Sequence, residues 1–300
     1  MSDQITTAMV DTYKSGLTML AQQKQSKLLG RVRVEHDTGK RVSFDQIGAV
    51  KARKKTERNG DTKYINTPHK RRWATHEDFE IADLMDKFDV IKILNQPGGE
   101  YAKAFIAALN RERDTSILAA ALGTAYTGET GLTGVALPAA QKIAVGGTGF
   151  TYAKVEEAMD ILAGGNAVDP DSELTIAWTR KQEKEFLQNA EVKSIDYNTQ
   201  KVLVKGGMGD APFYGFTYVR LEDWTDEEGA TNQIIPKSGT TRSCVAWVKN
   251  GLLLNEPGPS EVLVDRMPGK GQATQIWSGA SFAATRMQES MVVQIDVLEA

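Results

Sequence analysis

The sequence predicts an α+β fold in which a charged two-stranded ribbon, one long helix and a compact unit of alternating strands and helices follow one another. The helix is indicated by Glu100–Leu122, which lacks glycine and proline and repeats apolar residues every three to four positions. The ribbon is indicated by charged and apolar residues that alternate at Arg31–Val34 and at Arg41–Phe44. Strand and helix patterns alternate after residue 151, which favours a separate compact unit.

The long helix is expected to span about residues 99–123. Pro97-Gly98-Gly99 breaks the chain before it, and Gly123 suits the position just after its end. At about 1.5 Å per residue, such a helix is about 34 Å long. Its middle, Arg111-Glu112-Arg113-Asp114, is polar on several faces. We therefore expect that it is not wholly buried in one core.

Charge is segregated along the chain. Residues 31–75 contain 13 Lys and Arg against 5 Asp and Glu, a net charge of +8, and residues 76–100 contain 2 against 7, a net charge of −5. The whole chain of 300 residues carries only −3, so its overall charge does not indicate a nucleic-acid-binding protein. The basic segment and the acidic segment after it are complementary in charge.

Residues 31–65 predict a long ribbon, because turn signals occur at 37–40 and at 59–61. A two-stranded ribbon is marginal in isolation, so a neighbouring subunit is a plausible support. Three interpretations of its basic residues stay open: a solvated loop, a contact with acidic surface of a neighbour, or nucleic-acid binding. No aromatic residue lies between 45 and 63, which disfavours stacking on single strands. The basic residues are Arg41, Lys51, Arg53, Lys54, Lys55 and Arg58.

The N-terminal residues form one helical apolar stripe. Ile5, Met9, Tyr13, Leu17 and Leu20 are spaced by 4, 4, 4 and 3 positions. A polar stretch follows and ends at Gly30. This amphipathic arm could fold back on its own core or dock on a neighbouring subunit, and the pattern favours neither.

The acidic segment is expected to be a solvated or ion-paired face that serves as the partner of the ribbon. Its leading members are Glu77, Asp78, Glu80 and Asp83. Their spacing fits no calcium loop. Glu80 stands where the zinc motif that begins His-Glu would need a second histidine. We therefore expect no metal site here.

The sequence predicts no catalytic, cofactor-binding or metal-binding residue, and so not an enzyme. The three histidines all lie before residue 77, and neither a Gly-x-Ser-x-Gly elbow nor a phosphate-binding glycine motif occurs. The one cysteine, Cys244, lies in an apolar run and is expected to be a small buried side chain. No signal peptide and no apolar run of about 18 residues is visible, so no membrane association is expected.

The compact unit is expected to run from 151 to about 260. A helix begins near Tyr152, a strand follows at Leu174–Trp178, and Thr179 with Gln182 predicts a capping box on the next helix. Further strands are expected at 201–204, 213–221 and 243–248, then at 262–264 and through 272–298. The last strand, Met291–Leu298, is expected to return to the sheet near the long helix.

Local sequence resembles one group of tailed-phage major capsid proteins. The resemblance rests on Arg71-Arg72-Trp73, on Asp83–Asp89, on Tyr101, Arg111 and Asp114, on Ala284–Met287, on Val292–Ile295, and on the order of the predicted parts. It covers nearly the whole chain and implies the Hong Kong 97-type fold. The implied parts are an N-terminal arm at 1–30, an extended E-loop at 31–75, a peripheral P-domain at 76–150 with 261–300 that holds the spine helix 99–123, and an axial A-domain at 151–260.

The resemblance also implies a function and a set of partners. The subunit would assemble with itself into hexamers and pentamers of an icosahedral head around double-stranded DNA, bound without sequence specificity, in the virion after assembly in the host cytoplasm. A separate scaffolding protein, a portal protein at one vertex and a decoration protein are the other implied partners. Two alternatives stay open: a nucleic-acid-binding protein that uses the basic ribbon 31–72, and an encapsulin-like compartment shell.

Overall fold

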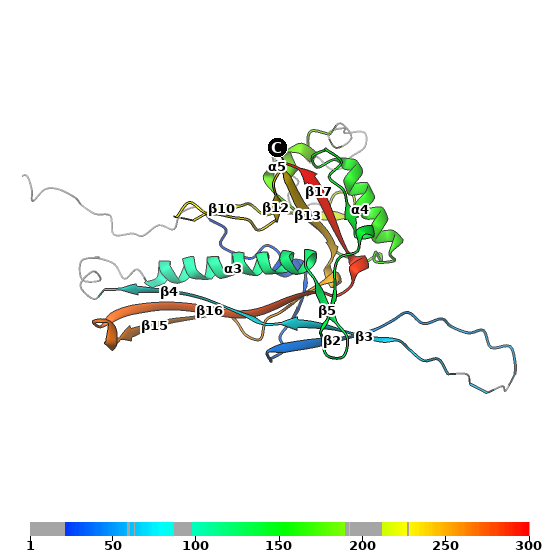
Figure 1. Ribbon diagram of the computed structural model, residues 1–300, viewed down its shortest axis with the longest axis horizontal. Coiled ribbons are helices and arrows are strands. Elements are labelled where there is room, and N and C mark those ends of the chain that lie inside the picture. Colours follow the sequence, from blue (N-terminus) through cyan, green and yellow to red (C-terminus); the bar gives the residue numbers. More distant parts are fainter. Residues whose placement is uncertain are drawn as a thin grey trace, which may run out of the picture.

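The computed structural model shows an elongated molecule with a compact unit at one side and a long loop at one end (Figure 1). It describes residues 22–58, 61–62, 64–86, 98–189, 192, 212–226 and 228–299. The predicted strand at 201–204 and the apolar stripe of the arm lie outside the described residues.

The long helix is α3, Gly98–Leu122, as predicted. It lies along a sheet with the strand order β1, β14, β16, β15, in which β4 pairs with the other edge of β16 (Figure 1). The described part of the acidic segment after residue 76 is one continuous strand to Met85. The strands are β1 (Arg33–Glu35), β4 (Glu77–Met85), β14 (Leu252–Asn255), β15 (Glu261–Met267) and β16 (Ala273–Arg286).

The compact unit is a six-stranded sheet with two helices beside it. Helix α4 spans Tyr152–Gly164, and α5, Arg180–Phe186, begins with the predicted capping box. The strand order is β7, β17, β13, β8, β9, with β12 pairing on β13. The strands are β7 (Lys142–Ile143), β8 (Leu174–Trp178), β9 (Phe216–Arg220), β12 (Lys237–Ser238), β13 (Thr241–Val248) and β17 (Val292–Leu298).

The predicted place of the last strand was wrong. β17 pairs with β13 and β7 in the compact unit, not with the sheet beside α3. The ladder with β13 runs from Thr241 opposite Leu298 to Trp247 opposite Val292. The end of the chain therefore belongs with 151–260, although the predicted peripheral part included it. β14 lies within the range predicted for the compact unit, but it pairs with β16 in the α3 sheet.

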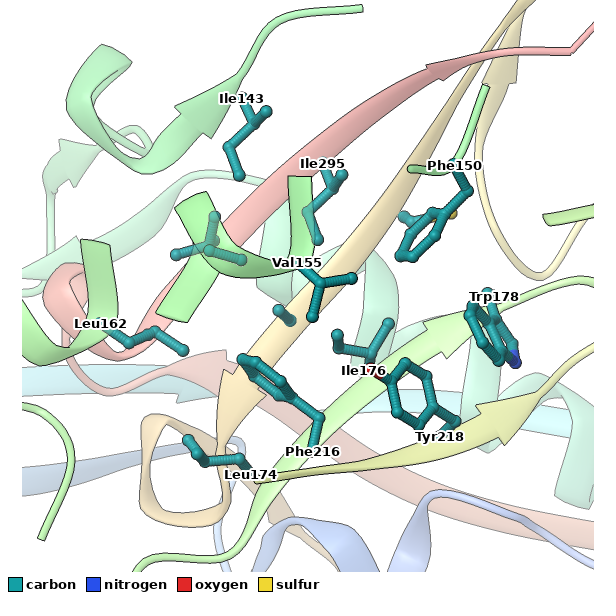
Figure 2. Packing of buried hydrophobic residues seen from close by; sticks show 14 of the residues in the cluster. Ile143, Phe150, Val155, Leu162, Leu174, Ile176, Trp178, Phe216, Tyr218 and Ile295 are labelled. Atoms are coloured by element: carbon teal, nitrogen blue, oxygen red, sulfur yellow. The ribbon is translucent and has the colours of Figure 1, made fainter. Parts of the chain in front are cut away.

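Strand β13 separates two hydrophobic cores. Successive strand residues point to opposite faces: Cys244 and Ala246 belong to the core beneath α4, while Val245 and Trp247 face the core beneath α3. Figure 2 shows the first of these cores. Cys244 is fully buried, as predicted, and burial raises the pKa of its thiol.

A four-stranded sheet carries the ribbon region. Its order is β2 (Arg41–Ile47), β3 (His69–Thr75), β5 (Ala125–Thr127) and β6 (Thr133–Val135). The ribbon predicted over 31–65 was wrong in its pairing. The first segment, β1, pairs in parallel with β14 in the other sheet, and β2 pairs with β3, whose residues follow the predicted ribbon.

Short elements complete the described fold. A two-stranded ladder joins β10 (Trp224–Thr225) to β11 (Thr231–Asn232). Single 3-10 turns span Leu29–Arg31, Ala139–Gln141, Lys249–Gly251, Pro268–Lys270 and Glu289–Met291.

Candidate assembly surfaces

The basic loop, defined here as residues 48–68, joins β2 to β3 and projects away from the rest of the molecule (Figure 1). In it, Lys51, Arg53, Lys54, Lys55 and Arg58 are all exposed. Its described residues form neither strand nor helix. The structure thus brings five of the six predicted basic residues together on one projecting segment.

The β2–β3 hairpin and the basic loop also expose large apolar side chains, which the pattern of charge did not predict. Ile47 is 72% exposed, Val50 55%, Tyr64 90% and Ile65 46%. Apolar side chains gathered on a projecting segment are typical of a surface that becomes covered by a partner. The signal was present in the sequence as Val50 and Tyr64-Ile65, which flank the basic run.

Arg41, the sixth predicted basic residue, makes contacts within its own chain. Its guanidinium lies 4.8 Å from the centre of the Trp73 ring and donates to the carbonyl oxygen of Gly131 at 2.9 Å. Trp73 Nε1 in turn donates to the carbonyl of Gly128 at 2.7 Å. A Cβ at Gly131 would meet the Trp73 ring at 2.6 Å, so only glycine permits this close approach. Arg41 thus lies at the start of β2, apart from the five basic residues of the loop, and it remains exposed.

We expect Arg41→Ala to lower the free energy of unfolding by about 1–2 kcal/mol, because it removes a cation–π contact and backbone hydrogen bonds. Urea unfolding measures this change. Lys40→Ala, at the exposed neighbouring position, is the matched control and should change little. Equal stability of the two variants would show that Arg41 is not part of the hairpin's support.

The base of the hairpin is held by a second arginine. Arg72 is only 6% exposed; its Nε donates to the carbonyl of Met287 at 2.9 Å, and its Nη2 donates to both carboxylate oxygens of Glu289 at 2.5 and 2.6 Å. Gln46 Nε2 donates to the same Met287 carbonyl at 2.8 Å. Both strands of the hairpin are therefore fixed to the turn between β16 and β17.

The predicted acidic partner residues lie on β4, an edge strand of the α3 sheet. Glu77, Asp78, Glu80 and Asp83 are exposed. Glu77 has a different role from the rest, since its charge and burial together raise the pKa of Glu112 on α3, with burial the larger cause. Among the described residues, no ion pair within the chain joins β4 to the basic loop. The acidic edge is thus open to a partner.

The polar middle of α3 is largely buried, although other positions along the helix are exposed or half-buried, in line with the expectation that the helix is not wholly buried in one core. A strap, defined as residues 22–32, covers this polar middle. Asp114 is 0% exposed and accepts hydrogen bonds from Gln23 Nε2 at 2.5 Å, Ser26 Oγ at 2.6 Å, and the backbone N–H groups of Lys27 at 3.1 Å and Leu28 at 3.3 Å. Burial raises the pKa of Asp114, and the hydrogen bonds partly oppose that rise.

The strap ties α3 to the compact unit. Lys27 Nζ donates to the carbonyl of Arg220 at 2.7 Å, and Trp247 Nε1 donates to the carbonyl of Arg31 at 3.0 Å. Leu28 and Val32 are buried in the core beneath α3. The predicted arm residues Met9, Tyr13, Leu17 and Leu20 lie outside the described residues, but the point from which the arm leaves the body is fixed by the strap.

Two further buried arginines join parts of the chain that are distant in sequence. Arg286, 0% exposed, donates to the carbonyls of Ala121, Gly123 and Val135 and so caps the end of α3. Arg242 on β13 pairs with Asp223 at 2.6 Å and with Glu299. Sequence reasoning missed both, because the partners are brought together only by the tertiary fold.

The part of the chain that the structure describes contains no group of three or more His, Cys, Asp or Glu arranged to hold a metal ion. In the same residues, no helix has the length and apolar character needed to cross a membrane.

Comparison with known proteins places the chain among viral shell proteins. A family model described as phage capsid protein matches residues 5–299. No curated protein matches the sequence. In its fold the chain is similar to the head of Helicobacter pylori bacteriophage KHP40, with a TM-score of 0.72, 9% identity, and 97% of this chain and 96% of that chain covered.

Two further solved structures share the fold. The capsid of cyanophage P-SCSP1u matches with a TM-score of 0.68 and 13% identity, covering 98% of this chain and 94% of that one. Microbacterium phage Oxtober96 matches with a TM-score of 0.65 and 15% identity, covering 100% and 99%. At these identities the likeness is one of fold, and it extends over nearly the whole length of each chain.

Proposed function

The chain belongs to the phage capsid protein family, and from this premise we propose that the basic loop of each subunit lies on the acidic β4 edge of a neighbour in the shell. The protein is a major capsid protein that self-assembles into an icosahedral head with the Hong Kong 97-type fold. The observation that supports the proposal is the placement of five exposed basic residues on a projecting loop and of exposed acidic residues on a sheet edge with which no other strand of the described residues pairs.

Electrostatics and apolar burial have different parts in this contact. Complementary charges at the rim of an interface steer association and fix its register more than they add affinity. The exposed apolar side chains Ile47, Val50 and Tyr64 can supply the affinity, since each loses contact with water when it is covered. The specificity and the affinity of this interface would thus come from neighbouring residues of the basic loop and of the end of β2.

The other partners are proposed on the family alone. We propose that the head encloses double-stranded DNA without sequence specificity, that it assembles in the host cytoplasm, and that a scaffolding protein, a portal protein and a decoration protein act with it. The net charge of −3 supports a shell that does not bind phosphate tightly. The division into an arm at 1–30, an E-loop at 31–75 and peripheral and axial domains also remains a proposal, with the C-terminal strand moved to the axial unit.

Reversing Lys54 and Lys55 to glutamate is expected to abolish or strongly slow assembly while leaving the subunit folded, because both side chains are exposed and far from either core. Electron microscopy and a sizing column measure assembly, and thermal unfolding measures the fold. Adding Asp78→Lys and Asp83→Lys to the same chain restores opposite charges across the interface and should recover shells. Normal assembly of the first variant would contradict the proposed contact.

The same variant separates this proposal from nucleic-acid binding through the loop. A DNA-binding loop predicts affinity for duplex DNA that falls steeply with salt and is lost in the Lys54→Glu, Lys55→Glu variant. The shell interface predicts that assembly, not DNA retention, is what the variant loses. Loss of DNA binding with unchanged assembly would favour the nucleic-acid interpretation.

A further inference from the structure

A groove with an aromatic floor lies on the face of the β4–β16–β15 sheet that points away from α3. Its lining includes Trp277, Asp78, Glu80, Glu261, Pro257 and Pro259. Trp277 is opposite Leu263 on one side and Ala82 on the other, so it stands on the middle strand of the three. The two prolines come from the turn between β14 and β15 and form one wall.

The indole of Trp277 packs against a glycine of its own strand, β16. A Cβ at Gly279 would meet the ring at 2.4 and 2.5 Å, so the ring packs directly on the glycine backbone. Trp277 Nε1 donates to Glu80 Oε2 at 3.2 Å, which fixes the ring in its plane. The six-membered ring of the indole thus lies against Gly279, and Trp277 lines the groove beside it.

The electrostatic character of the groove is that of a receptor for a cation. Asp78, Glu80 and Glu261 are exposed around the ring, and no lysine or arginine is among the residues that line the groove. An aromatic face beside carboxylates suits a guanidinium in particular, because its planar group can stack on the ring while its N–H groups donate to oxygen. A bare acidic cluster would not make this distinction between arginine and lysine.

We propose that this groove binds an arginine from the basic loop of a second copy of the chain, either Arg53 or Arg58. The two arginines are exposed on the loop. The loop between β2 and β3 projects away from β4 and β15, the strands that flank the groove (Figure 1). The inference rests on the proposed function and deepens it, because it replaces a general attraction between charged segments with a defined pocket and a defined type of side chain.

The first test links the two partners covalently. The chain has one cysteine, Cys244, which is fully buried. A variant with Arg53→Cys and Glu261→Cys should therefore join subunits only through the new thiols when treated with a short bismaleimide. A ladder of covalent multimers on denaturing gels is expected. Arg53→Cys with Asp160→Cys, an exposed site on α4, is the matched control and should give no ladder.

A sizing column on the same samples distinguishes the two ways to fail. Assembled material without a ladder above the control overturns the arginine site and leaves the shell interface standing. Monomers under every condition, for the unaltered chain as well as for both cysteine variants, overturn the arginine site together with the proposed loop contact. A ladder in assembled material supports both.

The second test asks whether the groove requires an aromatic ring and an arginine, and not merely a positive charge. Trp277→Ala, and separately Arg53→Lys with Arg58→Lys, should raise the protein concentration needed for assembly by about 5- to 30-fold, the range expected for loss of a desolvated cation–π contact. The lysine variant keeps every charge, so a change there cannot come from net charge. Unchanged assembly of the lysine variant and of Trp277→Ala would overturn the proposal even if Lys54→Glu, Lys55→Glu blocks assembly.

Discussion

Replacing Asp114 with alanine is expected to lower the free energy of unfolding by at least about 3 kcal/mol, a large fraction of the stability of an ordinary domain. The carboxylate accepts four hydrogen bonds from the strap while it is completely buried. Alanine leaves the backbone N–H groups of Lys27 and Leu28 without this acceptor, and each unsatisfied buried donor costs about 1–3 kcal/mol.

We expect the strap to detach from α3 before the rest of the protein unfolds. The strap holds Lys24 and Lys27, so trypsin should cut there faster in the Asp114→Ala variant than in the unaltered protein, whereas cleavage in the exposed basic loop should be equally fast in both. Unfolding in urea and a time course of tryptic cleavage measure the two effects. Asp160→Ala, an exposed aspartate on α4, is the matched control and should behave like the unaltered protein in both assays.

A released strap also has a consequence for the shell. Because the strap fixes where the arm leaves the body, Asp114→Ala should reduce the yield of closed shells even at temperatures where the cores remain folded. If the variant matches Asp160→Ala in stability, cleavage and assembly, Asp114 is not the anchor of the strap.

Sequence patterns predicted the elements whose stabilising contacts are local. The periodicity of α3, the Thr179–Gln182 capping box and the burial of Cys244 are confirmed. Each depends on residues close together in the chain, so its signal survives in the sequence alone. The overall type of fold followed from the order of these elements.

The errors arose where the deciding partner is distant in sequence. The sequence did not reveal what covers the polar middle of α3, because the residues that bury it, at 23–28, lie 86 to 91 positions away from Asp114. β1 alternates like one half of a hairpin, yet it pairs with β14, more than two hundred residues later. An alternating pattern predicts that a segment forms a strand, but it does not identify the strand with which the segment pairs. For the same reason, β17 was assigned to the wrong sheet.

In the candidate surfaces, too, features that depend on local residues were predicted and features that depend on distant partners were not. The charge pattern located the basic loop and the acidic edge, since exposed charge needs no partner to be recognised. It did not reveal that Arg41 packs on Trp73 within the chain, nor the exposed apolar residues of the loop. It also did not reveal the groove around Trp277, because Gly279, Glu80 and the two prolines converge there only through the pairing of three strands.

The ion-pair cluster at the far end of β13 should give the protein a distinct sensitivity to acid. Glu299 accepts from Arg242, from Lys237 Nζ at 2.9 Å and from Gln182 Nε2 at 2.8 Å. Burial alone would raise the pKa of the Glu299 carboxyl, but these hydrogen bonds outweigh it and lower the pKa from 4.5 to about 2. Arg242 is nearly buried and also pairs with Asp223.

The sign of the effect follows from the two pKa values. Since the folded state binds the proton more weakly than the unfolded chain, Glu299 contributes stability that is fully present above the unfolded pKa of 4.5 and is lost as the pH falls towards about 2. The difference corresponds to about 3 kcal/mol at neutral pH. Between roughly pH 5 and pH 2 the free energy of unfolding should fall by about that amount on account of this residue.

Glu299→Gln should therefore lower the free energy of unfolding by about 2–3 kcal/mol at pH 7 and much less near pH 2, so that the two stability curves converge in acid. Urea unfolding across this pH range measures the convergence. Glu156→Gln, at an exposed position on α4, should follow the unaltered protein throughout. Parallel curves for Glu299→Gln would mean that its loss of stability comes from altered packing. Convergence would show that the six-stranded sheet of the compact unit is stabilised by a charged Glu299 that joins β17 to Arg242.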